Sequence, residues 1–281
     1  MSDVTGDGGA MTGRAAQAPT ITGFQAGYVD IHGWPTWHEV SGKGPAVALL
    51  HGGFSGASAW SAQAPALASD GFRVYVPERR GHAHTPDRDG PLSYAVMAED
   101  TIAYLEQVVD GPAHLVGWSD GAVVALLVAQ RRPDLAARLV LIGQYYNSSG
   151  RLSDPALENW LRSPEAMDLL RQGYDPLSPD GPGHFPVVYA KSIAMLDAEP
   201  ELDLATFGAV TAPTLVLQGD RDVVTVGHSA AVAAALPDAR LAVLPGTHAL
   251  PLELPGVINP LLVSFLRGTV SAGFADFLGG G

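Results

Sequence analysis

The 281-residue chain contains no cysteine, which excludes disulfides, thiolate nucleophiles and cysteine-ligated metals. Lysine is almost absent as well, occurring only as Lys43 and Lys191, and the formal net charge is −13 at pH 7. Nucleic acids and anionic membranes bind clustered Lys and Arg side chains, so neither is an expected partner. No apolar run reaches the roughly 18 residues that a membrane-spanning helix needs.

Apolar residues are abundant: 47% of the residues are hydrophobic and only 16% are charged. This apolar content is enough for a sizeable buried core. Residues 1–20 are rich in Gly, Ala and Thr and lack a basic start followed by an apolar run. We therefore expect a disordered leader rather than a secretory signal, and a cytoplasmic protein. Residues 268–281 are expected to form a flexible tail.

Short apolar runs alternate with segments of helical periodicity along the chain. The runs predict strands at 25–32, 35–40, 45–50, 72–77, 113–118, 137–143, 214–219 and 241–246. Helices are expected at 58–71, 93–110, 122–133, 226–236 and 256–267, the second burying a face with Val96, Ile102, Leu105 and Val108. Such alternation is typical of an α/β fold, here a mostly parallel eight-stranded sheet with helices on both faces.

The alternation stops between residues 144 and 204, where the sequence is more polar and repeatedly interrupted by proline. This insertion after the sixth strand predicts a small helical lid, which separates a first core part (21–143) from a second (205–267).

The pentapeptide GWSDG (117–121) lies where a predicted strand meets a predicted helix. Gly117 and Gly121 flank Ser119 symmetrically, as in the tight turn that exposes a nucleophilic serine. Ser119 could instead cap the next helix, and Asp120 could itself be a nucleophile, but the central position belongs to the serine. The backbone N–H of Asp120 can then donate to an oxyanion.

A serine nucleophile needs a base and an acid that orients the base. LQGDRDVV (217–224) follows a predicted strand and offers Asp220 and Asp222, and LPGTHALP (244–251) follows the last strand and offers His248. The carboxyl ends of strands in an open sheet are where such side chains gather.

The order of HGG (51–53), GWSDG (117–121), GDRD (219–222) and GTH (246–248) resembles the α/β-hydrolase fold family over about residues 24–267. The resemblance implies that Asp222 rather than Asp220 is the catalytic acid. It also implies a second oxyanion donor at the N–H of Gly53, a structural role for His51, and chemistry without a cofactor.

Several side chains are candidates for the substrate pocket or its surroundings. Phe54, Trp118, Tyr145 and Tyr146 are expected to line or edge the pocket. Structural roles are expected for Arg79, Arg80 and His82, with a place at the pocket entrance as the alternative, and for His184 and Phe185 inside the lid. Ala83–His84 departs from the R-G-x-G turn of the family. No histidine spacing indicates a metal site.

These residues predict a serine hydrolase that cleaves a small carboxylic ester or similar apolar acyl compound through an acyl-enzyme. A lactonase, a carbon–carbon bond hydrolase and a cofactor-free perhydrolase are alternatives on the same triad. A non-catalytic ligand-binding protein is the alternative from another class. The expected state is a monomer or a homodimer.

Overall fold

The computed structural model describes residues 20–151 and 155–270, and the predicted leader and most of the predicted tail lie outside these ranges. Its centre is one sheet with the strand order β1-β2-β4-β3-β5-β6-β7-β8. The strands are β1 (Gln25–Ile31), β2 (Trp34–Gly42), β3 (Ala46–Leu50), β4 (Arg73–Pro77), β5 (Ala113–Trp118), β6 (Ala136–Ile142), β7 (Thr214–Gly219) and β8 (Ala239–Leu244). Only the pairs of β2 with β1 and with β4 are antiparallel, so the prediction of a mostly parallel eight-stranded sheet is confirmed.

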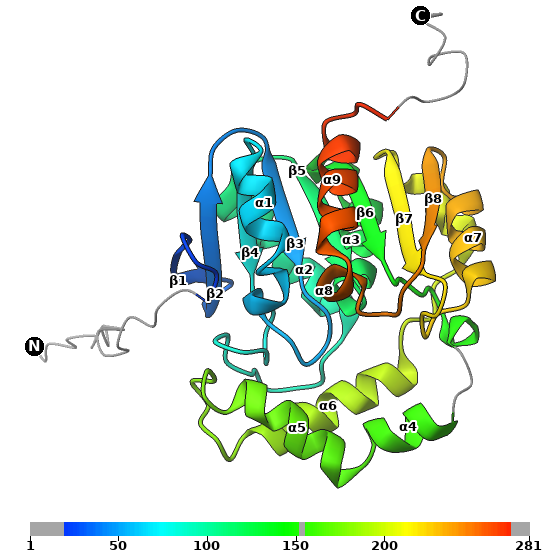
Figure 1. The fold of residues 1–281 in the computed structure, drawn as a ribbon. Coiled ribbons are helices and arrows are strands. Elements are labelled where there is room, and N and C mark those ends of the chain that lie inside the picture. Colours follow the sequence, from blue (N-terminus) through cyan, green and yellow to red (C-terminus); the bar gives the residue numbers. More distant parts are fainter. Residues whose placement is uncertain (1–19, 152–154, 271–281) are drawn as a thin grey trace, which may run out of the picture.

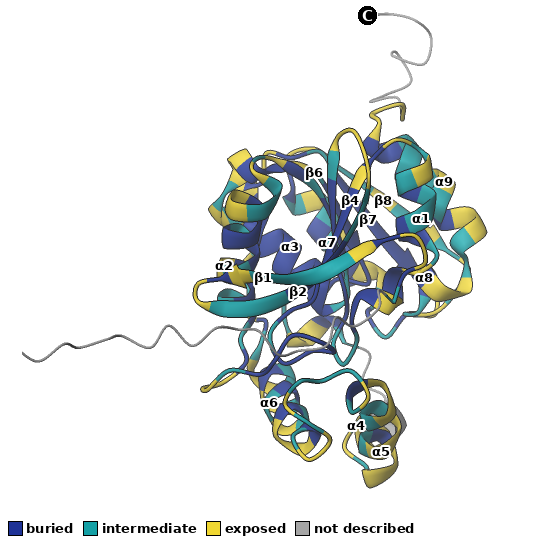
Figure 2. Ribbon diagram, turned by 90° about the vertical axis from the view of Figure 1, so that its left-hand side faces the viewer, coloured by how far each residue is buried: buried dark blue, intermediate teal, exposed yellow. Residues whose placement is uncertain are grey.

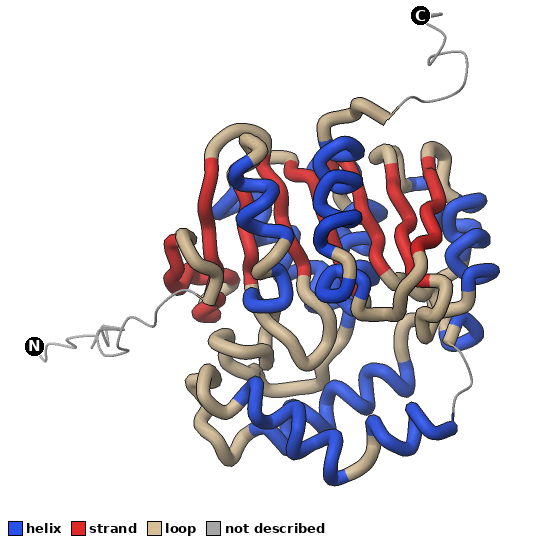
Figure 3. The backbone as a smooth tube through the Cα atoms, viewed as in Figure 1, coloured by secondary structure: helices blue, strands red, loops and turns tan. Residues whose placement is uncertain are grey.

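Helices cover both faces of the sheet (Figure 1; Figure 3). One face carries α1 (Gln63–Ser69), α8 (Leu250–Glu253) and α9 (Pro255–Leu266), and the other carries α2 (Tyr94–Tyr104), α3 (Asp120–Arg131) and α7 (Val226–Ala235). The central parallel strands β3, β6 and β7 are continuous apolar runs because both of their faces are buried between these helices. Burial of each large apolar side chain contributes about 1.5–3 kcal/mol.

Three further helices, α4 (Pro155–Leu161), α5 (Pro164–Tyr174) and α6 (Phe185–Ala198), lie between β6 and β7 in the chain. They lie apart from the helices that cover the sheet. They face the edge of the sheet at which the parallel strands end (Figure 1; Figure 2). We refer to residues 155–198 as the cap. Because loops at this end of the sheet bear the candidate site residues, the cap lies over them.

Two local features differ from the expectation. The buried face of α2 consists of Tyr94, Met97, Ala98, Thr101, Ala103 and Tyr104, and of the four residues predicted for this face Leu105, just after the helix, is fully buried. Val96 and Ile102 are only partly buried, because the helix turns its tyrosines toward the core. The chain also forms the short helix α8 ahead of α9, where the sequence predicts a loop.

Candidate active site

Ser119 lies in the sharp turn between β5 and α3. Its backbone has φ 55° and ψ −122°, a conformation that costs energy for a residue other than glycine and is typical of functional sites. The turn fits only because the residues two positions before and after Ser119 are glycines. A Cβ on Gly121 would lie 2.0 Å from the Leu50 carbonyl oxygen, and one on Gly117 would lie 2.3 Å from the Gly121 oxygen. The two glycines thus allow α3 to start directly behind the serine.

A line of hydrogen bonds joins the three residues that the sequence picked out. Ser119 Oγ lies 2.9 Å from His248 Nε2, and His248 Nδ1 lies 2.7 Å from Asp222 Oδ1. The carboxylate fixes the imidazole with its proton on Nδ1, so Nε2 is free to accept the proton of the serine. Asp222 is buried, whereas the His248 ring is partly open to the site.

Asp220, the competing acid, lies elsewhere. Its side chain is exposed and its Oδ1 accepts a hydrogen bond from the Gly246 N–H at 2.9 Å, which ties the loop after β7 to the loop after β8. Asp222 faces inward from the same loop, and its Oδ1 also accepts from the Val224 N–H at 3.1 Å. The structure therefore brings Asp222, and not Asp220, to the histidine.

Gly143, just after β6, leaves room for the histidine. It has φ 59°, and a Cβ there would lie 2.9 Å from the His248 ring and 3.2 Å from Asp222 Oδ2. A side chain at this position would therefore push the imidazole away from its two partners.

Gly53 and Asp120, the predicted oxyanion donors, lie against each other at the base of the site. A Cβ on Gly53 would lie 2.5 Å from Asp120 Oδ2, so the buried carboxylate requires glycine at this position. Phe54 follows with φ 53°, which turns the loop sharply away from the sheet. Both residues that would supply an N–H to an oxyanion therefore meet beside Ser119.

The Asp120 carboxylate is held by a pair of tyrosines. Tyr94 donates its hydroxyl proton to Asp120 Oδ1 at 2.7 Å, and the Tyr94 and Tyr145 hydroxyls lie 2.9 Å apart. Burial, followed by the negative charge of Asp120, raises the pKa of both tyrosines above the ordinary value. The two phenols are therefore neutral at physiological pH and act as hydrogen-bond donors.

A cavity of about 460 Å³ opens in front of the serine. It is lined by Gly53, Phe54, Ser119, Asp120, Tyr145, Arg151, Glu158, Leu161, Arg162, Ile193, Leu196, Asp197, Val223, Val224 and His248. Six of these residues belong to the cap, and a seventh, Arg151, precedes it. They contribute both apolar and charged groups to the cavity wall. The volume suits a small organic molecule rather than a polymer.

Of the four expected pocket residues, Phe54 and Tyr145 line this cavity, whereas Trp118 and Tyr146 do not. Trp118 donates from its Nε1 to the His248 carbonyl oxygen at 2.7 Å and supports the histidine loop from behind. Tyr146 stacks on His228 with ring centroids 3.9 Å apart. Each is adjacent in the sequence to a residue that does line the cavity, Ser119 and Tyr145 respectively.

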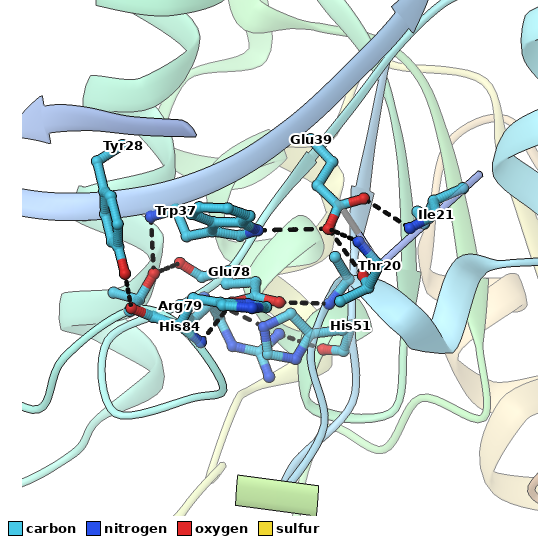
Figure 4. A network of polar contacts seen from close by, with 11 residues as sticks. Thr20, Ile21, Tyr28, Trp37, Glu39, His51, Glu78, Arg79 and His84 are labelled. Atoms are coloured by element: carbon cyan, nitrogen blue, oxygen red, sulfur yellow. Dashed lines mark hydrogen bonds and ion pairs between the residues drawn. The ribbon is translucent and has the colours of Figure 1, made fainter. Parts of the chain in front are cut away.

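The loop after β3 is supported by the turn after β4 (Figure 4). His51 is fully buried and accepts a hydrogen bond from the Arg79 N–H at 3.1 Å, while Arg80 pairs with Asp100. Buried Glu78 accepts from the N–H groups of Ala57 and His84. His82 lines a second cavity of about 140 Å³ beneath the cap.

The cap is attached to the core through Asp87, a buried residue in the loop before α2. His184 Nε2 lies 2.8 Å and Lys191 Nζ 2.7 Å from Asp87 Oδ2. Phe185 is buried with Tyr174 inside the cap. His184 and Phe185 thus both hold the cap together or in place.

Sequence reasoning did not find Arg151, Tyr94 or the cap residues that line the cavity. Val223 and Val224 directly follow the catalytic-acid candidate, which is a signal that could have indicated them. The cap side chains carry no such signal, because their distance from the serine depends on how three helices pack.

Across the described part of the chain, no group of three or more His, Asp or Glu side chains is arranged to hold a metal ion. Within the same ranges, no helix has the length and apolar character that crossing a membrane requires.

Comparison with known proteins places the chain in a family. Residues 45–197 match the family model of the alpha/beta hydrolase fold. The chain is 40% identical to a pimeloyl–acyl-carrier-protein methyl ester esterase of Methylococcus capsulatus over 105 residues, 37% of this chain and 39% of the esterase. It is 28% identical to a pyrrolizixenacetamide deacetylase of Xenorhabdus hominickii over 81% of this chain and 92% of that one.

Among solved structures, the enol-lactonase of Burkholderia xenovorans LB400 superposes with a TM-score of 0.70 at 21% identity, over 85% of this chain and 99% of that chain. The chain belongs to the alpha/beta hydrolase fold family, as the resemblance predicted, and is an enzyme of the hydrolase class. The match to the methyl ester esterase spans less than half of that relative's length, so the substrate does not transfer with it.

Proposed function

We propose that the protein hydrolyses carboxylic esters with a small or medium apolar acyl group, through an acyl-enzyme on Ser119. The observation that carries this proposal is the line Ser119–His248–Asp222, with donor–acceptor distances of 2.9 and 2.7 Å, at the floor of a cavity of about 460 Å³. Nucleophilic acyl transfer needs a serine, a histidine whose Nε2 carries no proton, and a buried carboxylate that orients the histidine.

In the first half of the reaction, Ser119 Oγ attacks the ester carbonyl carbon while His248 Nε2 takes its proton. The negative charge moves to the carbonyl oxygen, where the N–H groups of Gly53 and Asp120 donate to it. His248 then returns the proton to the departing alcohol, which leaves an ester between the acyl group and Ser119. Loss of one such oxyanion donor costs about 3–4 kcal/mol of transition-state stabilisation.

In the second half, water donates its proton to His248 Nε2 and attacks the acyl carbon. His248 then returns this proton to Ser119 Oγ as the bond between the acyl carbon and Ser119 Oγ breaks, and the carboxylic acid departs. Asp222 keeps the imidazole oriented and stabilises its charged form in both halves. Every proton is moved by residues of this chain, so no cofactor takes part.

The substrate preference rests on the cavity wall. Phe54, Leu161, Ile193, Leu196 and Val224 offer apolar contacts for the acyl group or the alcohol. We propose that the cap, residues 155–198, selects the substrate in this way, because it supplies most of the wall that lies away from the serine.

The test is steady-state kinetics on p-nitrophenyl esters of increasing acyl length, on lactones and on vinylogous diketones. We expect kcat/KM to be highest for short or medium esters, and Ser119→Ala to lower kcat by at least about 10⁴-fold. Ser149→Ala, which changes an exposed serine near the base of the cap, is the matched control. Turnover of lactones or diketones alone would replace the ester assignment, and full activity of Ser119→Ala would refute the mechanism.

A further inference from the structure

Arg79 is a buried charged residue that the mechanism above does not use. Its side chain is only 6% exposed, and both ends of its guanidinium point at the loop after β3. Nη1 donates to the His51 carbonyl oxygen, and Nη2 donates to the Gly52 carbonyl oxygen at 3.0 Å. Figure 4 shows the guanidinium beside the His51 ring.

Packing alone does not account for this residue. A buried cation pays a large desolvation cost, and an apolar side chain of similar length would fill the same space without it. Arg79 forms no ion pair with a carboxylate of the described residues, and its Nε has no hydrogen-bond partner among them. Burial lowers the pKa of Arg79 to about 10, so it still carries its charge at neutral pH.

The contact with Gly52 acts directly on a candidate oxyanion donor. The carbonyl of Gly52 and the N–H of Gly53 belong to one planar peptide group, in which they point in opposite directions. A donor that holds the carbonyl therefore also holds the N–H. His51 Nε2 accepts from the Arg79 N–H, so its proton is on Nδ1, which donates to the same Gly52 carbonyl at 2.8 Å. Two hydrogen bonds thus fix and polarise this peptide group.

The Asp120 carboxylate creates a need for a compensating charge. It lies against Gly53 and so beside the point where the substrate oxygen becomes negative. A fixed anion there opposes an oxyanion. The tyrosines that hold Asp120 are neutral and do not offset its charge. Arg79 binds the Gly52 carbonyl, and the next residue, Gly53, lies against the Asp120 carboxylate. The attraction of Asp120 raises the pKa of Arg79 and so offsets part of the lowering that burial causes.

We propose that Arg79 is a positioning residue of the oxyanion hole, which aims the Gly53 N–H into the cavity and balances the charge of Asp120 as the oxyanion forms. This inference rests on the proposed function, since it assumes an oxyanion beside Ser119. Arg80, the next residue, provides a natural comparison. It lies in the same turn, but its guanidinium donates to Asp100 instead of to the loop after β3.

The experiment combines Arg79→Met and Arg79→Lys with the Asp120→Asn background, and uses Arg80→Lys as the control. Each variant is assayed for kcat and KM on a p-nitrophenyl ester, for inhibition by a trifluoromethyl ketone that forms a tetrahedral adduct, and for thermal unfolding. A positioning role acts on the transition state, whereas a merely structural role has no reason to separate the ketone from the substrate.

We expect Arg79→Met to lower kcat by about 10²-fold with little change in KM, and to weaken ketone binding by a similar factor. Arg79→Lys keeps the charge and should lose about tenfold. In the Asp120→Asn background the Arg79→Met loss should shrink at least tenfold, because no carboxylate remains to be balanced. Arg80→Lys should leave both quantities within about twofold.

The inference is overturned if either Arg79 variant keeps wild-type kcat and ketone affinity, or if kcat falls while ketone affinity does not. An equal loss in both backgrounds overturns the charge balance. Should Arg79→Met fail to fold, Arg79→Gln, which also removes the charge, replaces it in the two backgrounds. Failure of the proposed function is separate, because there Ser119→Ala itself would remain active.

Discussion

At the scale of single residues, two aspartates two positions apart have opposite surroundings. Asp222 is buried, bonded to the imidazole and supported by the Val224 N–H. Asp220 is exposed and bonded to a backbone N–H of the neighbouring loop. The motif residues alone leave both aspartates as candidates for the catalytic acid. Both lie in the loop after β7, and the path of this loop decides which carboxylate faces the histidine.

This difference predicts opposite outcomes for the same chemical change. Asp222→Asn should lower kcat by about 10⁴-fold, because an amide in this place favours the wrong imidazole tautomer. Asp220→Asn should lower kcat by less than about fivefold, since an amide oxygen can still accept from the Gly246 N–H. Steady-state ester hydrolysis measures both, and an Asp220→Asn loss as large as that of Asp222→Asn would show that the acid is wrongly assigned.

Residues next to a recognisable motif could be predicted, and residues that reach the site from elsewhere could not. Ser119, Asp120 and His248 lie in short motifs whose glycines and strand ends have a local physical meaning, whereas the role of Gly53 was implied by the family resemblance. No short motif indicates the role of Arg79. One position separates it from Arg80, and only the path of the turn decides which guanidinium faces the loop after β3.

At the scale of elements, the central strands of the sheet were predicted closely because β3, β5, β6 and β7 are short apolar runs buried on both faces. The cap is different. A proline occupies the first or second position of each of its helices α4, α5 and α6, where it starts the helix rather than ends it. The sequence indicates an insertion there, but its contacts with the core depend on long-range ion pairs that no local pattern reveals.

The attachment of the cap through Asp87 makes a prediction about stability. Asp87→Asn removes the buried negative charge to which His184 and Lys191 bind. We expect the free energy of unfolding to fall by about 1.5–3 kcal/mol. Faster limited proteolysis within residues 155–198 should accompany it. Urea unfolding and protease digestion of the native protein measure the two effects.

Asp197→Asn is the comparison, because it removes an exposed ion pair between Arg162 and α6 and should cost less than about 1 kcal/mol. If both variants lose the same stability, or if cleavage in Asp87→Asn occurs first in the core, the cap is not held through Asp87.

At the scale of the whole molecule, buried histidines couple the stability of the fold to pH. Burial lowers the pKa of His228 and His114 to about 4 and that of His82 to about 3, with Arg138 and Arg79 lowering the last two further. Below pH 6.5 these histidines bind protons in the unfolded chain, whereas in the folded chain they stay neutral until a lower pH. Folding is therefore most favourable above about pH 6.5 and weakens as the pH falls toward 4.

We accordingly expect urea unfolding to give a smaller free energy at pH 5 than at pH 7.5. His228→Gln should reduce this difference, since it removes one of the histidines with a lowered pKa while its amide oxygen can still accept from the Tyr146 N–H. His32→Gln changes a half-exposed ring on the surface and is the control. Equal stability at the two pH values, or an unchanged difference in His228→Gln, would contradict this account.

The central claim, that Ser119 is the nucleophile of an acyl-transfer reaction, is tested most directly by labelling with a fluorophosphonate followed by mass spectrometry. The account predicts one adduct per chain, located on Ser119 by peptide mapping, absent in Ser119→Ala and slowed at least about a hundredfold in His248→Ala. An unlabelled wild-type protein, an adduct on another residue, or undiminished labelling of Ser119→Ala would contradict it.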